Sequence, residues 1–268
     1  MNTYHNMNKM IEYIEMHLNE NISYKDLAKI LGVNEYTMKV LFSFICNISL
    51  AEYIRKRRLS SAGLDLCTTD EKIVDLAVKY QYDNATSFSR AFEKFHGIKP
   101  SMAKENPNGL KVYPKIVLSE EEKEVPNMEY SIIERKPIVL YGKGIKTTHS
   151  KITNDAPKFF EKMDELYLNK YGEINYGMTV YEDRFESDEY EYWILYEKEI
   201  PEFIECKIAG GRYLKFIINS QNAEEIQKVT NGFYENFLPS CKYNLRELPE
   251  LEYYHDGITD FLVPIEDY

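Results

Sequence analysis

Apolar residues recur at helical spacing over the first hundred positions, and the first clear pattern is a helix, a tight turn and a second helix. Ser23 followed by Asp26 has the spacing of a capping box and predicts a helix through Ile30-Leu31. Gly32 permits the turn, and Asn34 is placed to cap the next helix. That helix carries four apolar residues on one face: Met38, Leu41, Phe42 and Ile45.

The same pattern returns about fifty positions later. The triplet Asp-Leu-Ala at 26–28 recurs at 75–77, 49 positions further along the chain. Thr68 with Glu71 is predicted to open the first helix of this second copy, and Asn84 is predicted to cap its second helix. The inward face of that second helix is apolar: Phe88, Ala91, Phe92 and Phe95.

A further helix, from about Leu50 to Leu66, is predicted to join the two copies. It carries the basic cluster Arg55-Lys56-Arg57-Arg58. A rod of this kind holds two second helices about 34 Å apart, so that both enter successive major grooves of one duplex. We interpret Lys56 as part of a solvated helix face. For Arg55, Arg57 and Arg58, a DNA phosphate contact and an intramolecular salt bridge are equally good alternatives.

The net charge of −11 at first argues against a nucleic-acid-binding protein. The charge is divided unevenly, however. Residues 1–107 carry 14 basic and 13 acidic side chains, whereas residues 108–268 carry 19 and 31. All of the acidity therefore lies in the second part, which indicates two domains with different partners.

Residues 9–104 resemble the DNA-binding domain of AraC/XylS-type transcription regulators. The resemblance rests on LAKILGVNEYTMKVLFSFICNISLAEYIRKRRLSSA and on IVDLAVKYQYDNATSFSRAFEKFHGIKPSMAK, in which F-S-R-A-F and G-I-K-P are the most specific part. It implies an all-α domain with two helix–turn–helix motifs, in which the second helix of each motif reads double-stranded DNA. The implied reading positions are Tyr36, Lys39 and Val40, followed by Ala85, Thr86, Ser89 and Arg90.

The chemistry of these positions is uneven. Arg90 is suited to a bidentate contact with guanine, which discriminates against a wrong base by about 1–3 kcal/mol. The alternative for Arg90 is an ion pair with Glu93, one turn further on. Lys39 and the hydroxyls of Thr86 and Ser89 suit hydrogen bonds to base edges, whereas Val40 suits only a thymine methyl group.

The sequence departs from the family pattern in the second turn, where Gln81-Tyr82 stands in place of the frequent Gly-Phe. Ser43 and Phe44 also occupy positions that are often basic. With a net charge of only +1 over residues 1–107, we expect modest and salt-sensitive DNA binding, helped by dimerisation or by RNA polymerase.

The region from 107 to 126 lacks periodicity and includes the acidic run Glu120-Glu121-Glu122, which we interpret as solvated. The predicted organisation is therefore a DNA-binding domain over 1–106, an exposed linker over 107–126 and a second domain over 127–268. Within the linker, five apolar residues are candidates for an ordered contact: Val112, Tyr113, Ile116, Val117 and Leu118.

The second domain has its own repeat, in the order strand, strand, helix, strand, strand. The first copy has predicted strands at 130–133, 138–141, 176–181 and 190–196, with a Lys136-Pro137 hairpin turn and Pro157 in the first turn of its helix. The second copy, about 75 residues later, has strands at 203–208, 212–218, 248–254 and 257–264, with Asn222 capping its helix. We predict an α+β domain in which one antiparallel sheet carries both helices on one face.

This order, together with IAGGRYLKF, FYENFLPS, LPELEYY and FLVPI, resembles the gyrase-inhibitor-like effector-binding domain. The resemblance implies a groove between the two halves that binds a small molecule, with aromatic walls and an acidic residue at the floor. The family pattern of an aromatic or aliphatic residue, Glu, any residue and Tyr matches residues 251–254, and so nominates Glu252 for that floor.

A carboxylate in an apolar box is costly to bury unpaired, so a lipophilic or cationic effector is expected. Aromatic faces attract the same cation by about 0.5–2 kcal/mol each. The candidate pocket residues besides Glu252 are Trp193, Tyr176, Tyr181, Tyr192 and Tyr213. The alternative is that these aromatic residues alternate along strands simply to fill the core.

Several classes of protein are disfavoured. No apolar run approaches the roughly 18 residues of a membrane span, and the N-terminus has no apolar signal core, so we expect a cytoplasmic protein without membrane partners. Four dispersed cysteines without a CxxC pair indicate reduced thiols. No metal-ligand motif or cofactor signature occurs, and we expect neither group.

We therefore expect a ligand-responsive transcription regulator that is not an enzyme. Two alternatives come from other classes. One is a hydrolase of small molecules with Glu252 as general base, although no nucleophile–His–Asp set supports it. The other is a module that sequesters a protein partner such as gyrase.

Overall fold

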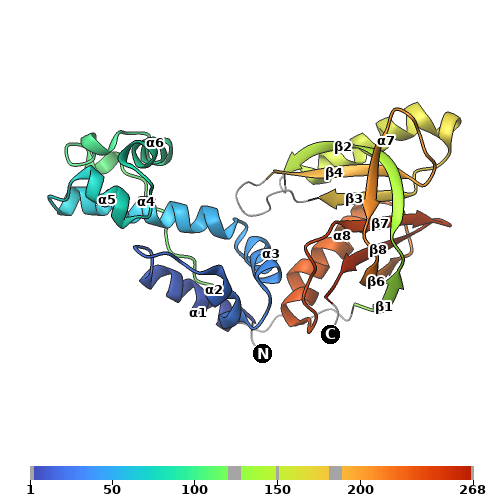
Figure 1. Cartoon of the computed structure of the whole chain (residues 1–268), viewed down its shortest axis with the longest axis horizontal. Coiled ribbons are helices and arrows are strands. Elements are labelled where there is room, and N and C mark those ends of the chain that lie inside the picture. The colour runs from blue at the N-terminus through green and yellow to red at the C-terminus, as the bar shows by residue number, and fades with distance from the viewer. Residues whose placement is uncertain (1–2, 120–127, 149–150, 181–188, 267–268) are drawn as a thin grey trace. The chain divides into compact units, whose positions relative to one another are not determined.

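The computed structural model of the chain describes residues 3–119, 128–148, 151–180 and 189–266 (Figure 1). Contacts between residues divide the chain into two compact units. One unit holds residues 2–35 and 48–121, and the other holds residues 36–47 and 122–268. The acidic run at 120–122 lies outside the described residues.

The N-terminal half is helical and contains the two predicted helix–turn–helix motifs. Its helices are α1 (Thr3–Met16), α2 (Tyr24–Leu31), α3 (Glu35–Cys46), α4 (Leu50–Thr68), α5 (Ile73–Lys79) and α6 (Ala85–His96), followed by the 3-10 turns η1 (Pro100–Met102) and η2 (Pro107–Gly109). Two predicted caps are confirmed: the Ser23 side chain accepts from the N–H of Asp26, and the Asn84 side chain accepts from that of Ser87. Gly32 has φ +73°, a left-handed conformation that ends α2.

The predicted start of the second motif at Thr68 is wrong. Helix α4 continues to Thr68, whose hydroxyl donates back to the carbonyl of Leu64 (2.9 Å) instead of capping a new helix. The next helix, α5, begins at Ile73 after Lys72, which makes no side-chain cap. A Thr hydroxyl can donate to a carbonyl one turn back in its own helix as readily as it can cap the start of a new helix. The spacing of Thr68 and Glu71 alone therefore did not distinguish these two roles.

The second motif has a core of its own, built between α4, α5 and α6. The prediction for α6 is confirmed, because Phe88 and Phe92 are fully buried and Ala91 and Phe95 pack against the same cluster. The rest of the buried cluster is apolar apart from one tyrosine hydroxyl: Leu59, Ala62, Leu66, Leu76, Ala77, Tyr80 and Ala103.

Residues 110–118, which belong to the predicted exposed linker, instead form an ordered strap along the helices. The backbone N–H of Lys111 donates to His96 Nδ1 (3.1 Å), and that of Tyr113 donates to the Ser60 hydroxyl (3.1 Å). At the far end of the strap, Leu118 and the side-chain amide of Asn8 exchange two hydrogen bonds of 2.9 Å each. The candidate ordered contact of the linker is thus found at Tyr113 and Leu118, whereas the side chains of Val112 and Val117 are exposed.

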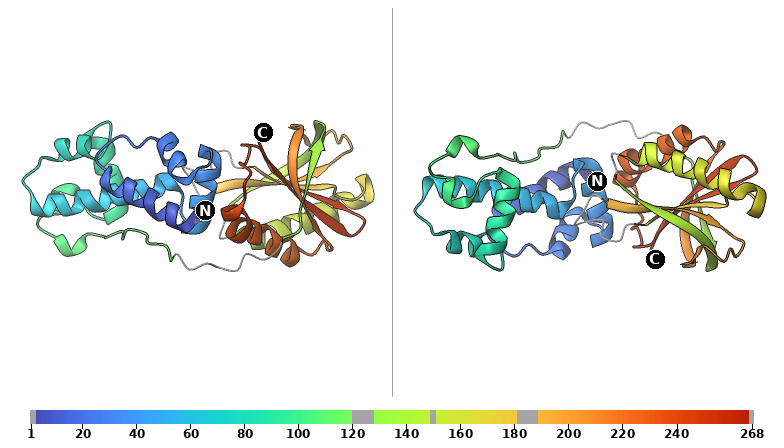
Figure 2. Two further views of the ribbon diagram at one scale, coloured as in Figure 1. Left: turned by 90° about the horizontal axis from the view of Figure 1, so that it is seen from below. Right: turned by 90° about the horizontal axis from the view of Figure 1, so that it is seen from above.

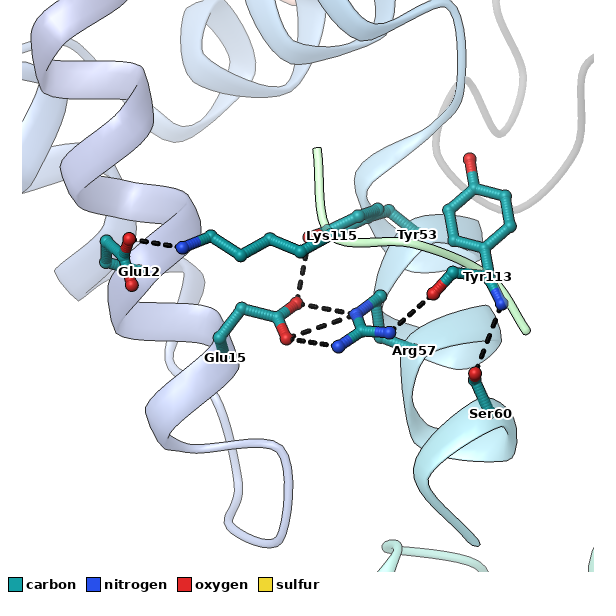
Figure 3. A network of polar contacts seen from close by, with 7 residues as sticks. All are labelled: Glu12, Glu15, Tyr53, Arg57, Ser60, Tyr113 and Lys115. Atoms are coloured by element: carbon teal, nitrogen blue, oxygen red, sulfur yellow. Dashed lines mark hydrogen bonds and ion pairs between the residues drawn. The ribbon is translucent and has the colours of Figure 1, made fainter. Parts of the chain in front are cut away.

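An ion pair lies under the strap and is shown in Figure 3. Arg57 Nε donates to Glu15 Oε1 (2.9 Å) and its Nη2 donates to Oε2 (2.6 Å), while Nη1 donates to the carbonyl of Tyr113. The Tyr53 hydroxyl donates to the same carboxylate (2.8 Å). Burial alone raises the pKa of Glu15, but the hydrogen bonds from Arg57 and Tyr53 and the charge of Arg57 outweigh it and lower that pKa.

The C-terminal half is an antiparallel sheet of eight strands. They are β1 (Ser131–Arg135), β2 (Ile138–Thr148), β3 (Tyr176–Val180), β4 (Glu189–Tyr196), β5 (Ile204–Ile208), β6 (Gly211–Ile218), β7 (Glu250–His255) and β8 (Ile258–Pro264). The order in the sheet is β1-β6-β8-β7-β3-β4-β2-β5. The predicted duplication and single sheet are confirmed, and β3 and β7, one from each copy, pair at its centre.

The predicted hairpin around Lys136-Pro137 is wrong. β1 and β2 do not pair with each other, because β1 pairs with β6 while β2 pairs with β4 and β5. The two copies thus exchange their first strands. Gly210 makes this exchange possible at the crossing point, since a Cβ atom there would lie 2.7 Å from both the Arg135 carbonyl and the Pro137 ring.

Two helices cover one face of the sheet. They are α7 (Ile152–Tyr171) and α8 (Ala223–Gly232), the latter continuing through the π turn η3 (Phe233–Phe237) and the 3-10 turn η4 (Leu238–Ser240). Helix α7 contacts β2 and β4, α8 contacts β6 and β8, and Figure 2 shows both on the same side of the sheet. The Asn222 cap is confirmed, with its side chain accepting from Glu224 and Glu225. Pro157 lies in the second turn of α7, not the first, because the helix begins five residues earlier.

Within the described residues, no single helix is both long and apolar enough to cross a membrane; α3 and α4 pass that test only as a pair bent by 64°. The four cysteines are free thiols. Over the same residues, no three His, Cys, Asp or Glu side chains are grouped so that they could hold a metal ion.

The Glu15–Arg57 pair is expected to contribute strongly to the stability of the helical half, because its side chains are only 14% and 16% exposed. Arg57→Ala should lower the free energy of unfolding by about 2 kcal/mol, since it leaves the Glu15 carboxylate half-buried without its partner. Urea unfolding followed by circular dichroism measures this change. Arg55→Ala, which removes a solvent-exposed pair with Glu52, is the matched control and should cost less than about 1 kcal/mol.

The same pair predicts a pH dependence. Because the folded pKa of Glu15 lies below its ordinary value of 4.5, its contribution is complete above pH 4.5 and is lost as the pH falls through the folded pKa. The difference between wild type and Arg57→Ala should therefore shrink in acid. A difference that stays constant down to the acid end of the titration would show that Arg57 stabilises by packing alone.

Candidate DNA-reading helices and effector site

Helix α6 presents its predicted reading positions to solvent. Thr86 and Arg90 are exposed, and Ala85 and Ser89 are partly exposed on the side opposite the buried Phe88. Arg90 makes no ion pair with Glu93 among the described residues, so its guanidinium keeps all five donors for another acceptor. This arrangement suits the bidentate contact with guanine that its side chain predicts.

The predicted base-reading side chains of helix α3 are less exposed to solvent than those of α6. Tyr36 and Lys39 are partly exposed, whereas Val40 is completely buried. A thymine contact by Val40 would require that side chain to become accessible. The two reading helices therefore differ, and α6 is the better supplied with exposed donors.

The basic cluster of α4 is largely engaged within the protein. Arg57 lies in the half-buried pair with Glu15, and Arg55 forms an ion pair with Glu52. Arg58 donates to the carbonyls of Leu18 and Glu20. Of the two alternatives for Arg57, a DNA phosphate contact and an intramolecular salt bridge, the structure contains the salt bridge. The Arg55 side chain is half exposed at the surface.

The centre of the sheet carries a row of paired positions that face the helices: Lys143, Ile194, Gly177, Glu252, Phe261 and Phe216. The ends of the row contact both helices, since Lys143 Nζ donates to the Tyr167 hydroxyl (2.8 Å) on α7 and the Phe216 ring contacts Phe233 (5.4 Å) at the end of α8. Glu252 therefore lies at the junction of the two repeats, under the helices.

Glu252 forms a compact polar cluster with two tyrosines above Gly177. The Tyr254 hydroxyl donates to Glu252 Oε2 (2.5 Å), the Tyr192 hydroxyl donates to the same oxygen (3.2 Å), and the two hydroxyls lie 3.1 Å apart. A Cβ atom at Gly177 would come within 2.6–2.7 Å of all three groups. Only glycine leaves the space in which they meet.

The cluster lies in an apolar setting. Tyr192 and Tyr254 are buried, and the Phe160 ring of α7 meets the Tyr254 ring edge to face at 5.5 Å. Burial raises the pKa of Glu252 above its usual range, and the two phenol hydrogen bonds offset this only in part. Burial and the nearby Glu252 charge likewise raise the pKa of both tyrosines.

Glu252 has no cationic partner. Among the described residues, no Lys, Arg or His forms an ion pair with it and no donor contacts its Oε1 oxygen. Part of the residue remains accessible to solvent. A buried carboxylate of this kind keeps its charge only at a cost, which a bound cation would relieve.

The other predicted pocket residues lie on the opposite face of the sheet. Tyr176, Trp193 and Tyr213 belong to a single apolar cluster there, because strand alternation turns them away from Glu252 and Tyr192. Arg135 occupies this face, with its guanidinium 5.6 Å from the Tyr176 ring and 5.9 Å from the Tyr213 ring. These two rings thus contact a cation of the protein itself.

Of the predicted pocket residues, only Glu252 and Tyr192 are therefore found together in the described part of the structure. Tyr181 lies outside the described residues. The sequence prediction missed Tyr254, Gly177 and Phe160. Tyr254 was detectable, because it stands two residues after Glu252 on the same strand and so shares its face. Gly177 was also detectable as a glycine inside a strand pattern, which signals close approach of other groups.

Comparisons with known proteins agree with both halves of this description. The sequence model described as "Helix-turn-helix domain" matches residues 27–106, and that of "Integron-associated effector binding protein" matches residues 131–265, half of the chain. The HTH-type transcriptional activator AarP of Providencia stuartii is 33% identical over 103 residues, which are 38% of this chain and 76% of AarP.

The chain belongs to the AraC-type helix-turn-helix transcription regulators and carries an integron-associated effector-binding domain. The transcriptional regulator Rob of Salmonella typhimurium is similar across both halves, with 21% identity over 264 residues, 92% of this chain and 89% of Rob. Among solved structures, an integron cassette protein from the mobile metagenome of Vibrio cholerae is 17% identical, with 51% of this chain and 95% of that chain covered and a TM-score of 0.45.

Arg90→Ala is expected to weaken binding to the preferred DNA site by about tenfold to a hundredfold, because one bidentate base contact is lost. Sites selected from random duplexes by the wild-type protein provide the DNA, and fluorescence anisotropy gives the Kd. Lys94→Ala removes the same charge from the same helix and is the matched control. Equal losses for both variants would mean that Arg90 contributes only charge.

Glu252→Gln is expected to make the free protein more stable at neutral and alkaline pH. A carboxyl group whose folded pKa is raised destabilises the fold as the pH rises through that pKa, and the amide carries no charge. Urea unfolding between pH 4 and pH 9 should therefore show an advantage of the variant that vanishes in acid. A variant less stable than wild type at high pH would contradict the buried, unpaired carboxylate.

Proposed function

We propose that this protein is a transcription regulator whose C-terminal domain senses a lipophilic cation, with Glu252 as the charge partner of the effector. The observation that carries the proposal is the Glu252 carboxylate itself. It lies at the centre of the sheet, accepts two phenol hydrogen bonds on one oxygen, and has no protein cation beside it among the described residues.

The surroundings favour a cation with an apolar body. Tyr192, Tyr254 and Phe160 provide aromatic surface around the carboxylate, and ring faces attract cations where water is excluded. Cation binding would favour the ionised form of Glu252 and so lower its raised pKa. Binding should therefore release protons near the pKa of the free protein, and affinity should fall as the pH falls through it.

Effector binding would act on transcription only by its differential affinity for two states of the protein. We propose double-stranded DNA as the target of α3 and α6, RNA polymerase as a further contact, and the cytoplasm as the place of action. In this proposal the effector leaves unchanged, so the domain is a sensor and not an enzyme.

A second candidate function is hydrolysis of a reactive small molecule. The specific observation in its favour is the 2.5 Å contact between the Tyr254 hydroxyl and Glu252, whose pKa is raised, because such a pair can shuttle a proton. Product analysis by mass spectrometry after long incubation separates the two functions. A sensor returns each compound unchanged, whereas a hydrolase adds water to it.

The test of the sensing proposal compares ligands of similar shape and different charge. Tetraphenylphosphonium is the cation and triphenylphosphine oxide is the neutral compound, each titrated into the full chain by calorimetry. Glu252→Gln should raise the Kd of the cation by about thirtyfold and that of the neutral compound by less than threefold, since only the cation loses its counter-charge.

Glu250→Gln is the matched control for this experiment, because Glu250 is a second buried carboxylate on the same face and the same strand. It should leave the Kd of the cation within about threefold. Equal weakening of both ligands by Glu252→Gln would assign Glu252 a structural role. Trp193 is a poor optical reporter of this site, since it lies on the opposite face of the sheet.

A further inference from the structure

The helical half contains a half-open pocket, which we call the cavity, and none of the predicted base-reading residues lines it. It has a volume of about 430 Å³, within the range of small-molecule sites. Its walls come from the loop between α1 and α2, the first half of α4, and the turn between α5 and α6. The cavity therefore lies between the two helix–turn–helix motifs, on residues that all belong to one compact unit.

Arg58 contributes a positive charge to this cavity. Its Nε and Nη2 donate to the carbonyls of Leu18 (2.9 Å) and Glu20 (2.7 Å), which hold the guanidinium in place. No carboxylate forms an ion pair with it among the described residues, and Nη1 has no acceptor there. Burial lowers the pKa of Arg58 and outweighs the opposing contributions from Tyr82 and Tyr24. The guanidinium is thus a half-buried cation without a counter-ion.

Tyr82 contributes an unused hydrogen-bond donor. Its hydroxyl is buried and has no hydrogen-bond partner. The ring is held against Phe88 in an edge-on contact of 5.4 Å, so it is anchored in the core of the second motif. Buried hydroxyls are nearly always paired. Because Tyr82 also lines the cavity, a small shift of its ring would bring this hydroxyl within reach of a bound group.

The turn before Tyr82 also lines the cavity and connects the two motifs. Gln81 has φ +63°, a conformation that favours glycine, and its side-chain amide donates to the carbonyl of Asn19 (2.9 Å). The two residues that depart from the frequent Gly-Phe of related regulators thus supply a hydrogen bond between the two motifs and a tyrosine in the cavity wall.

The remaining walls are mostly apolar or aromatic, together with Asn21 and with Arg55, which is paired with Glu52. Ile22 and Ile54 are buried aliphatic residues, and the ring of Tyr24 lies with them. Tyr80 presents mainly its ring, because its hydroxyl already donates to Asp65 (2.7 Å). The cavity therefore offers a fixed cation and a phenol donor, both of which need an acceptor, surrounded by surface that suits a flat apolar body.

We propose that this cavity is a second effector site, which binds a small organic anion such as an aromatic carboxylate. The carboxylate would accept from Arg58 and from the Tyr82 hydroxyl, and the ring would lie among Ile22, Ile54 and Tyr80. Because its walls come from both motifs, an occupied cavity would hold them at one spacing, on which simultaneous contact with two major grooves depends. The site is independent of Glu252 and takes ligands of the opposite charge.

The experiment uses the full chain and sodium benzoate, with benzylammonium chloride as the cation of similar shape and inorganic phosphate as the anion without an apolar body. Calorimetry should give saturable binding of benzoate and no binding of benzylammonium. Phosphate should bind at least tenfold more weakly than benzoate. Absence of benzoate binding, or equal affinity for phosphate, would overturn the proposal.

Tyr82→Phe tests the site directly, because it removes only the unpartnered hydroxyl. The substitution should raise the Kd of benzoate by about five- to tenfold. It should leave the thermal midpoint of the free protein unchanged or slightly raised. Tyr80→Phe, which deletes a hydroxyl already bonded to Asp65, is the matched control and should leave the benzoate affinity within twofold. Unchanged benzoate binding by Tyr82→Phe would place the ligand elsewhere and reject the site.

A DNA phosphate offers the same acceptor chemistry, so a second arm measures DNA. Tyr82→Phe should bind a mixed-sequence duplex at low salt as tightly as wild type when benzoate is absent. If the substitution lowers the affinity for the duplex as much as the affinity for benzoate, the cavity binds the DNA backbone, and the small-anion proposal is wrong.

Discussion

The pairing of β3 with β7 is the constraint on which the effector domain depends. It joins the two repeats edge to edge, so that Gly177 of one copy lies directly beside Glu252 of the other. Tyr192 and Tyr254 then approach from the neighbouring positions and meet the carboxylate over the glycine. A shift of one residue in this register would turn Glu252 to the opposite face, where an apolar cluster and Arg135 lie.

The exchange of first strands supports that central pair from both sides. Because β1 adds to the second repeat and β2 receives β5, each copy is completed by a strand of the other, and neither repeat forms its half of the sheet alone. The junction under α7 and α8 is therefore built from strands of both repeats.

The helical half uses polar contacts in a different way. The strap at 110–118 connects the second motif, through His96, to α1, through Asn8, with the Glu15–Arg57 pair beneath it. Residues that composition marks as a linker are thus part of the DNA-binding half. The consequence is that the connection to the effector domain begins only after residue 118, on the surface of α1, and not at the end of the second motif.

The sequence by itself determined the element types, the two repeats and the N-caps at Ser23, Asn84 and Asn222, because these depend on local spacing and on the alternation of side chains along single elements. Glu252 as the central acid came from the resemblance to the effector-binding family. Only the tertiary structure decided the partners. Strand exchange, the engagement of Arg57 by Glu15, and the separation of Tyr192 from Tyr176, Trp193 and Tyr213 all arise from contacts between residues distant in the chain. Local pattern carries no information about which of two equivalent strands will be the neighbour, and that choice placed the acid, the phenols and the glycine together.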